Sequence, residues 1–315
     1  CLLAALLMIG TQAGFTFSGL KDFMASGREL AHAELIGALL IAGFGTLISL
    51  FPFHSWAAPA YASAPAPVAM MHAGVLKKFG LYGLFMFQPL METGFLPWTN
   101  ILLVLLVCNV IWVGYVTVNQ KRLDLLLGNS SVMHMGYIFL AFAALVVSGS
   151  AEANPWALKG AALLMLAHGL TIALLFLLCG QIEKQTGTLE INSLGGLSTR
   201  LPRMAFVFGL AGMASIGLPG LANFPGEFMV FFSGFAGFSN GFGPVQIATI
   251  LCLWGLVIGA VYMLRAYRNI FQGDLSKASA YATGLQPSER AANCFLVIAL
   301  AVFGFFPTLV LQFFS

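Results

Sequence analysis

Nine long apolar segments, separated by short polar connections, restrict how this sequence can fold more than any other feature. A helix crosses the hydrocarbon core of a bilayer with about 20 apolar residues, and each segment reaches or approaches that length. The segments cover approximately residues 1–19, 31–58, 64–90, 98–119, 125–149, 155–181, 204–236, 245–271 and 291–314. We therefore predict an all-α polytopic membrane protein with about nine transmembrane helices.

Composition excludes the other broad classes. The 315-residue chain is 59% hydrophobic and only 8% charged, whereas a soluble domain carries about 25% charged residues. A disordered chain needs low hydrophobicity and high charge, so that class is excluded as well. The net charge of +3 is too small to indicate nucleic-acid binding. The five cysteines form no CxxC pair, so they indicate neither a metal site nor a disulfide framework.

Two of the nine segments, 31–58 and 204–236, are longer than one crossing and are interrupted. The interrupting residues are Pro52 in the first segment and Pro219, Pro225 and Gly226 in the second. Proline removes a backbone donor and breaks a helix, and non-helical backbone persists at membrane depth only where protein or water covers it. We therefore predict two discontinuous helices, a pattern typical of inverted repeats around a transport site. Two ordinary proline kinks are the alternative interpretation.

Basic residues are divided unevenly between the two ends of the predicted helices. One end carries nine of them, namely Lys121, Arg122, Lys184, Arg200, Arg203, Arg265, Arg268, Lys277 and Arg290. The other end carries three, namely Lys21, Arg28 and Lys159. The positive-inside rule assigns the richer end to the cytoplasm, which predicts a C-terminus on the outer, periplasmic side.

Two lysines and one glutamate lie inside predicted spans. Lys77 and Lys78 are in the middle of segment 64–90, and Glu227 follows the second break with no basic residue within twenty positions. A charge at bilayer depth costs at least about 2.5–3.5 kcal/mol, so such residues are candidates for function. The alternatives are lysines that snorkel to the interface and a fixed structural Glu–Lys pair.

Four histidines lie in or beside the predicted spans, namely His54, His72, His134 and His168. A single buried histidine is more often a packing residue, but a set of them with lysine and glutamate can relay protons. We therefore predict a proton-translocation group that consists of Lys77, Lys78, His72, His134, His168 and Glu227. The sequence contains no phosphate-binding loop, GxSxG or HExxH motif, so we expect no bond-making catalysis in this chain.

The motifs around these residues resemble those of the antiporter-like membrane subunits of respiratory complex I. The resemblance rests on PFHSW at 52–56 with Pro52, His54 and Trp56, HAGVLKK at 72–78, SVMHMG at 131–136, AHG at 167–169 and LPGLANFPGEF at 218–228. The last motif carries Glu227, where sister subunits usually have lysine, and this difference points to the M-type chain of that family.

The resemblance implies a fold of fourteen helices in two inverted five-helix repeats, of which these segments correspond to helices six to fourteen. We therefore expect a chain truncated at its N-terminus. The expected divisions are 1–119 for the end of the first repeat and the start of the second, 120–271 for the rest of the second repeat, and 272–315 for a loop and the C-terminal helix.

By resemblance, Lys78 matches the central lysine, Glu227 the terminal carboxylate, and His168 the histidine between them. The resemblance also implies that this chain binds no redox cofactor. NADH, FMN, iron–sulfur clusters and quinone would belong to partner subunits, and the neighbours of this chain would be the lipid bilayer and other membrane subunits of the assembly.

Three positions depart from the family pattern. Leu47 occupies the position of the helix-seven lysine, Pro59 that of an aspartate, and Asp124 that of a lysine after the ninth helix. Either Lys77 replaces the missing lysine, or protons follow a modified route, or the chain has kept only a role in assembly.

These observations lead to one main functional prediction. We predict a proton-translocating subunit of an NADH:quinone oxidoreductase in the bacterial inner membrane. The alternatives are a subunit of an Mrp-type Na⁺/H⁺ antiporter, a subunit of a related membrane-bound hydrogenase, and a structural subunit that moves no protons.

Overall fold

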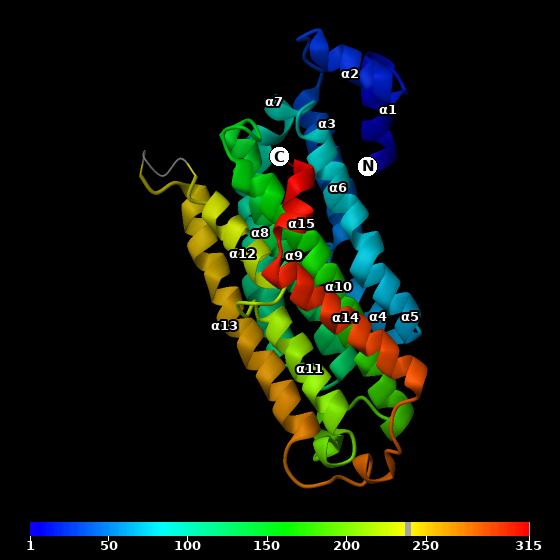
Figure 1. The fold of residues 1–315 in the computed structure, drawn as a ribbon. Helices are drawn as coiled ribbons and strands as arrows, with labels where there is room; N and C mark the ends of the chain where they lie inside the picture. Colours follow the sequence, from blue (N-terminus) through cyan, green and yellow to red (C-terminus); the bar gives the residue numbers. More distant parts are fainter. Residues whose placement is uncertain (237–240, 315) are drawn as a thin grey trace.

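The computed structural model describes residues 1–236 and 241–314 as an all-helical bundle (Figure 1). Five helices in this part of the chain are long and apolar enough to cross a bilayer. They are Thr93–Val118, which contains α8 (Thr99–Val118), then α9 (Leu123–Ser148), α10 (Pro155–Thr186), α13 (Pro244–Phe271) and α14 (Pro287–Phe305). The prediction of an all-α membrane protein is confirmed.

The nine predicted segments do not become nine continuous helices. The first forms two helices, α1 (Leu2–Ala13) and α2 (Phe17–Ala25), which are bent by 64° and count as a sixth span only if they are taken together. Gly14, with φ of 85°, ends α1, and the Thr16 hydroxyl caps α2 by accepting from the Gly19 N–H. The segments 31–58, 64–90 and 204–236 are also divided into shorter helices.

Both predicted discontinuous helices are present. In the first, α3 (Ala33–Ile48) and α4 (Ala57–Ser63) are separated by a turn that contains Pro52. In the second, α11 (Pro202–Ser215) and α12 (Asn223–Ser233) are separated by the turn around Pro219. Helix α3 ends at Ile48, four residues before Pro52, because Ser49 already has a left-handed backbone with φ of 70°.

A third irregularity interrupts segment 64–90, where the sequence predicted a continuous helix. There α5 (Ala66–Met71) continues into a π-helical turn, η1 (His72–Leu76), and then into α6 (Lys77–Phe87). Single π-helical turns inside α-helices occur frequently at functional sites. A side chain on Gly74 would meet the Gly169 carbonyl oxygen at 3.1 Å, so η1 and α10 approach each other backbone to backbone.

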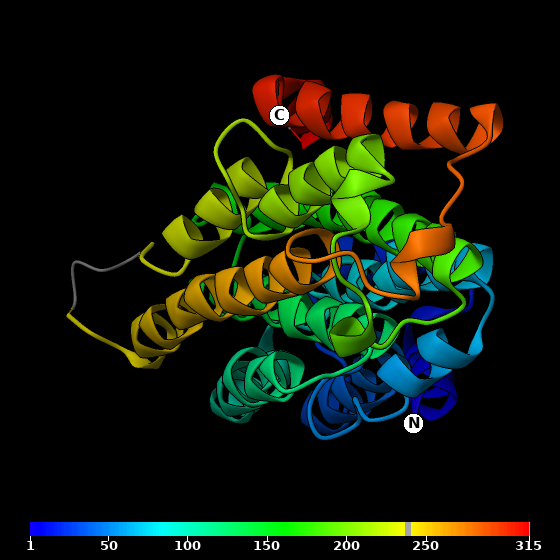
Figure 2. The same ribbon diagram turned by 90° about the horizontal axis from the view of Figure 1, so that it is seen from below.

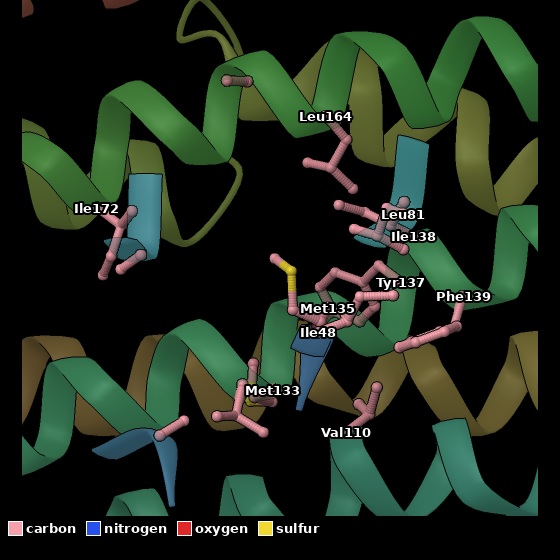
Figure 3. Close-up of a cluster of buried hydrophobic side chains, with 14 of the residues drawn as sticks. Ile48, Leu81, Val110, Met133, Met135, Tyr137, Ile138, Phe139, Leu164 and Ile172 are labelled. Carbon is pink, nitrogen blue, oxygen red and sulfur yellow. The ribbon is translucent and has the colours of Figure 1, made fainter. Parts of the chain in front are cut away.

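The core of the bundle is built around α9, which is buried along most of its length and packs against α8, α10, α12 and α13. Figure 3 shows Met133, Met135, Tyr137, Ile138 and Phe139 of α9 among apolar side chains from neighbouring helices. Because other helices surround α9 along most of its length, its polar groups have no access to water and must find partners inside the protein.

The remaining short elements connect the long helices. They are α7 (Glu92–Phe95), η2 (Leu96–Trp98), η3 (Ile191–Ser193), η4 (Leu197–Thr199), η6 (Ser279–Tyr281), α15 (Thr308–Leu311) and η7 (Gln312–Phe314). In contrast to α9, α14 lies on the outer face of the bundle (Figure 2). It is attached to α10 by two reciprocal hydrogen bonds between the amides of Gln181 and Asn293, at 3.1 and 2.9 Å.

The α8–α9, α10–α11 and α13–α14 connections meet at one end of the bundle, and the α1–α2 end lies opposite (Figure 1). The nine basic residues lie in these connections or in the adjoining ends of the helices. There the Arg265 guanidinium donates to the Gln120 carbonyl at 2.8 Å, and Lys184 pairs with Glu289 at 2.8 Å. Asp124 pairs with Arg122 at 2.6 Å in the same region. The unequal distribution of basic residues along the sequence is therefore also a separation in space.

Candidate functional site

Lys77 and Lys78 begin α6 directly after the π-helical turn, and both are buried. The Lys77 ammonium nitrogen lies 5.8 Å from the centre of the Tyr61 ring and has no hydrogen-bond partner among the described residues. The Lys78 ammonium instead donates to the carbonyl oxygen of Ala73, inside η1. The two adjacent lysines therefore have different surroundings.

Lys77 belongs to an aromatic group beside the first break. The rings of Trp56, Tyr61 and His72 pack against one another with centroids 5.5–6.4 Å apart, and His72 Nδ1 lies 3.4 Å from the Tyr61 hydroxyl. Lys77 interacts electrostatically with both His54 and His72. The structure thus brings together His54 and Trp56 of the first motif with the predicted residues His72 and Lys77.

Lys78 interacts electrostatically with a second group, which contains two of the predicted histidines. The His134 and His168 rings are stacked, with centroids 5.1 Å apart and planes 22° apart. His168 Nε2 lies 3.2 Å from the Ser131 hydroxyl. Because Lys77 and Lys78 are consecutive, they connect the aromatic group at the first break to this histidine pair.

His134 connects the pair to the second break. Its Nδ1 lies 2.8 Å from the Ser130 carbonyl oxygen, and its Nε2 lies 2.9 Å from the carbonyl oxygen of Ser215, the last residue of α11. The Ser130 side chain contacts the Tyr262 hydroxyl of α13 at 2.7 Å. His134 and Ser130 thereby join α9 to both α11 and α13.

Glu227 lies in the first half of α12 and is 3% exposed. Its Oε1 has no partner within the described part of the chain, and its Oε2 lies against the α-carbon of Gly217 in the break. Gly217 has φ of 79°, and a side chain there would collide with the carboxylate. Tyr137 and Tyr262 both interact electrostatically with Glu227.

A cavity of about 340 Å³ lies beside Glu227 and is lined mainly by phenylalanines of α12. The rings of Phe228 and Phe232, two of its lining residues, are about half exposed on the outer surface. Glu227 therefore borders a cavity whose outer side is formed by phenylalanine rings.

The other motif residues lie at or near the two breaks. The Trp56 indole donates to the Thr46 carbonyl at 3.1 Å across the first break. Gly226 faces the backbone of Leu164, which a side chain would meet at 2.9 Å, so α12 can pack closely on α10. Pro219 lies in the turn between α11 and α12. The prediction that Pro225 and Gly226 interrupt the helix is wrong, because both lie inside α12, where a proline in the first turn removes no hydrogen bond within the helix.

The sequence analysis missed several polar residues of this site. Three of them are spaced regularly around His134. Ser130 lies four residues before it, Ser131 three residues before it and Tyr137 three residues after it. Side chains at these spacings lie on the same face of a helix. That spacing could have identified them. Tyr262 carries no comparable signal, because it lies 132 residues from its partner Ser130.

Within the described residues, no three histidine, cysteine, aspartate or glutamate side chains converge so as to hold a metal ion. The arrangement is instead a line of buried ionisable and hydroxyl groups that passes both discontinuous helices. Such a fold and site define the class of antiporter-like membrane proteins. Residues 1–252 match the family model described as NADH:quinone oxidoreductase/Mrp antiporter, transmembrane, and the chain belongs to this family.

Similar proteins come from several assemblies. A chain 4 of NAD(P)H-quinone oxidoreductase from Synechococcus elongatus is 35% identical over 320 residues, which cover 99% of this chain and 57% of that protein. A chain in the structure of respiratory complex I from Thermus thermophilus with bound NADH superposes with a TM-score of 0.86 at 26% identity, covering 99% of this chain and 63% of that one.

A chain of the Mrp complex from Dietzia sp. has the same fold, with a TM-score of 0.81 at 19% identity over 99% of this chain and 64% of that one. The chain described here spans about three-fifths of the length of these relatives.

Proposed function

We propose that this chain forms part of the M-type (chain 4) antiporter-like subunit of an NAD(P)H–quinone oxidoreductase and that it translocates protons. The observation that carries the proposal is the buried line of ionisable groups from Lys77 to Glu227, which connects the two breaks. Intramembrane ionisable residues that face the interior of a bundle are typical of proton relays. The similarity to chain 4 of the Synechococcus enzyme supports the same conclusion.

The proposed proton route consists of five residues. A proton on Lys77 passes to Lys78, then to the stacked pair of His168 and His134, and finally to Glu227. Histidine suits the middle of such a route because each ring nitrogen can accept or release a proton. Redox chemistry belongs to the partner subunits with their NADH, FMN, iron–sulfur clusters and quinone. This chain contributes acid–base groups and the dry surroundings that keep the proton on the route.

For the orientation, we infer that the end with nine basic residues faces the cytoplasm of a bacterial cell and that the C-terminus faces the periplasm. The separation of the two basic sets in the fold supports this orientation (Figure 1). The relatives include cyanobacterial proteins, so a thylakoid membrane is the alternative location.

A structural role without proton transfer is the second candidate, and Leu47 is the observation that favours it. The face of α6 that follows Lys77 packs on α3 beside Leu47, since a side chain on Gly80 would meet Ile48. Residues three apart share a helix face, so Lys77 lies on the face of α6 that is directed toward α3, the helix that carries Leu47. This geometry favours replacement of that lysine by Lys77 over loss of pumping.

The test uses the full-length subunit in its assembled complex, in inside-out membrane vesicles. Lys78→Ala and Glu227→Gln variants are compared for NAD(P)H oxidation and for quenching of a pH-sensitive dye, with the amount of assembled complex as the control. We expect Glu227→Gln to depress proton uptake per NAD(P)H and Lys78→Ala to depress it more strongly. Full pumping by Lys78→Ala vesicles would contradict the proposal.

The nature of the assembly is tested separately, by mild extraction of the tagged subunit and identification of the proteins that co-purify with it. Iron–sulfur and quinone-site subunits are the expected partners. Co-purification of small membrane chains alone, together with sodium dependence of transport, would instead identify a cation/proton antiporter.

A further inference from the structure

Both ring nitrogens of His134 face main-chain carbonyl oxygens. The distances are 2.8 Å from Nδ1 to Ser130 and 2.9 Å from Nε2 to Ser215. A carbonyl oxygen only accepts hydrogen bonds, whereas a neutral imidazole has one donor and one acceptor nitrogen. In either neutral tautomer one lone pair of the ring would face a lone pair of a carbonyl. Only the imidazolium, with two N–H donors, satisfies both contacts.

We propose that His134 is held as an imidazolium between these two carbonyls and that the break between α11 and α12 responds to its charge. The charge of His134 follows from its two contacts alone. The role of that charge in proton transfer rests on the proposed function. It identifies His134 as the position where the proton rests between the lysines and Glu227.

The second acceptor has the properties that a buried cation requires. A buried charge is tolerated only when hydrogen bonds replace its hydration, and His134 is 2% exposed. The last carbonyls of a helix lack partners within the helix and carry a partial negative charge. Ser215 ends α11, so the His134 N–H binds at a helix end that favours positive charge.

His168 has different surroundings, although its ring is stacked on His134. Its Nε2 faces the Ser131 hydroxyl, which can either donate or accept, so His168 is satisfied when neutral. With ring centroids 5.1 Å apart, two cations would repel each other strongly in a medium of low dielectric constant. At most one of the two rings therefore carries a charge, and the contacts assign that charge to His134.

The other ionisable groups around His134 determine when it can carry this charge. They are Lys77 and Lys78 on α6, His168 on α10, Tyr137 on α9, Tyr262 on α13 and Glu227 on α12. The two lysines repel the imidazolium, so a proton on His134 disfavours a second proton on the lysines. His134 and the lysine pair are accordingly expected to be protonated in alternation.

The break connects this charge to Glu227. Ser215 accepts from His134, and Gly217, two residues later, lies against the Glu227 carboxylate. When His134 releases the proton on Nε2, the turn loses its donor at Ser215, and the carboxylate then packs against a less constrained backbone. Transfer toward Glu227 thereby loosens the segment against which Glu227 packs.

The charge is tested on the full-length subunit labelled with [¹⁵N]histidine in lipid bilayers, by solid-state NMR at pH 8. A solution histidine, with a pKa near 6.5, is almost entirely neutral at that pH. We expect a signal with both ring nitrogens protonated, which is lost in His134→Gln and retained in the matched control His168→Gln. Absence of any such signal in the wild-type subunit would overturn the proposal, even if His134→Gln failed to assemble.

The response of the break is tested by amide hydrogen exchange in the same samples. We expect His134→Gln to accelerate exchange in residues 216–222 about tenfold, the factor that a charged hydrogen bond of about 1.5 kcal/mol corresponds to, and His168→Gln to leave it unchanged. Equal exchange in both variants would refute the coupling. Vesicles that do not pump, with the imidazolium signal intact, would refute only the proposed function.

Discussion

The hydroxyl groups of Ser130 and Tyr262 lie 2.7 Å apart and join α9 to α13 in the centre of the bundle. The main chain of Ser130 also accepts from His134, and Tyr262 interacts electrostatically with Glu227. This pair therefore lies between the histidines and the carboxylate. Two other hydroxyl pairs in the described part of the chain, Thr16–Ser18 and Ser276–Ser279, lie at exposed or half-buried positions, whereas this pair is buried.

Tyr262→Phe removes one hydroxyl of this pair without changing the packing of the ring. We expect proton uptake per NAD(P)H to fall, because the polar connection between His134 and Glu227 is lost, and the stability to fall by about 1 kcal/mol, the usual net value of one hydrogen bond. Dye quenching in vesicles measures the first effect. Tyr267→Phe on the same helix, at a half-buried ring, is the control, and equal uptake in the two variants would exclude a role for the Tyr262 hydroxyl.

Lys77→Met tests whether Lys77 replaces the lysine that is missing at Leu47. Methionine matches the apolar stem of lysine and removes a buried amine that has no hydrogen-bond partner in the described structure, so we expect normal assembly with reduced pumping. Adding Leu47→Lys to this variant should restore part of the activity, because α3 and α6 pack together there. Normal pumping by Lys77→Met alone would show that Lys78 is sufficient.

Gly217→Ala places a methyl group where the Glu227 carboxylate now lies. We expect a loss of pumping similar to that of Glu227→Gln. The matched control is Gly187→Ala, because Gly187 has a similar φ of 70° but no atom within 4 Å of the added carbon. Both variants bear the backbone cost of about 1–2 kcal/mol for a left-handed alanine. Only displacement of the carboxylate distinguishes them, so an equal decrease in pumping would argue against this mechanism.

Asn109→Leu tests how the first break is held. The Asn109 side chain accepts from the Phe51 N–H at 2.5 Å and donates to the carbonyls of Ser49 and Val132 at 3.1 and 3.2 Å. Leucine would remove the partner of the Phe51 N–H and of the Ser49 carbonyl, at about 1–3 kcal/mol for each buried group. We expect a marked decrease in the thermal unfolding midpoint of the purified subunit.

Asn119→Leu is the control for that measurement, because the Asn119 side chain is exposed and donates its hydrogen bond to the Tyr115 carbonyl of the preceding helix turn. An unchanged midpoint for Asn109→Leu would mean that the break is stabilised elsewhere.

Local chemistry explains why much of this protein could be predicted from the sequence. Apolar length predicts membrane helices, proline predicts breaks, and a lysine or glutamate inside an apolar segment is costly wherever the segment packs. The breaks at Pro52 and Pro219 and the burial of Lys77, Lys78 and Glu227 follow from these local properties. The π-helical turn inside segment 64–90 was not predicted, because a local change in helical hydrogen bonding leaves the average hydropathy of a segment unchanged.

The partners of the buried groups could not be predicted, because they depend on helices that are distant in the sequence. Lys77 faces Tyr61 while Lys78 lies near His168 only because α6 packs on α3 and the preceding turn η1 packs on α10. Likewise, His134 contacts Ser215, 81 residues away. The residue types for proton transfer are therefore visible in the sequence, whereas their order and contacts come from the packing of the helices, since packing determines which groups lie within hydrogen-bonding distance.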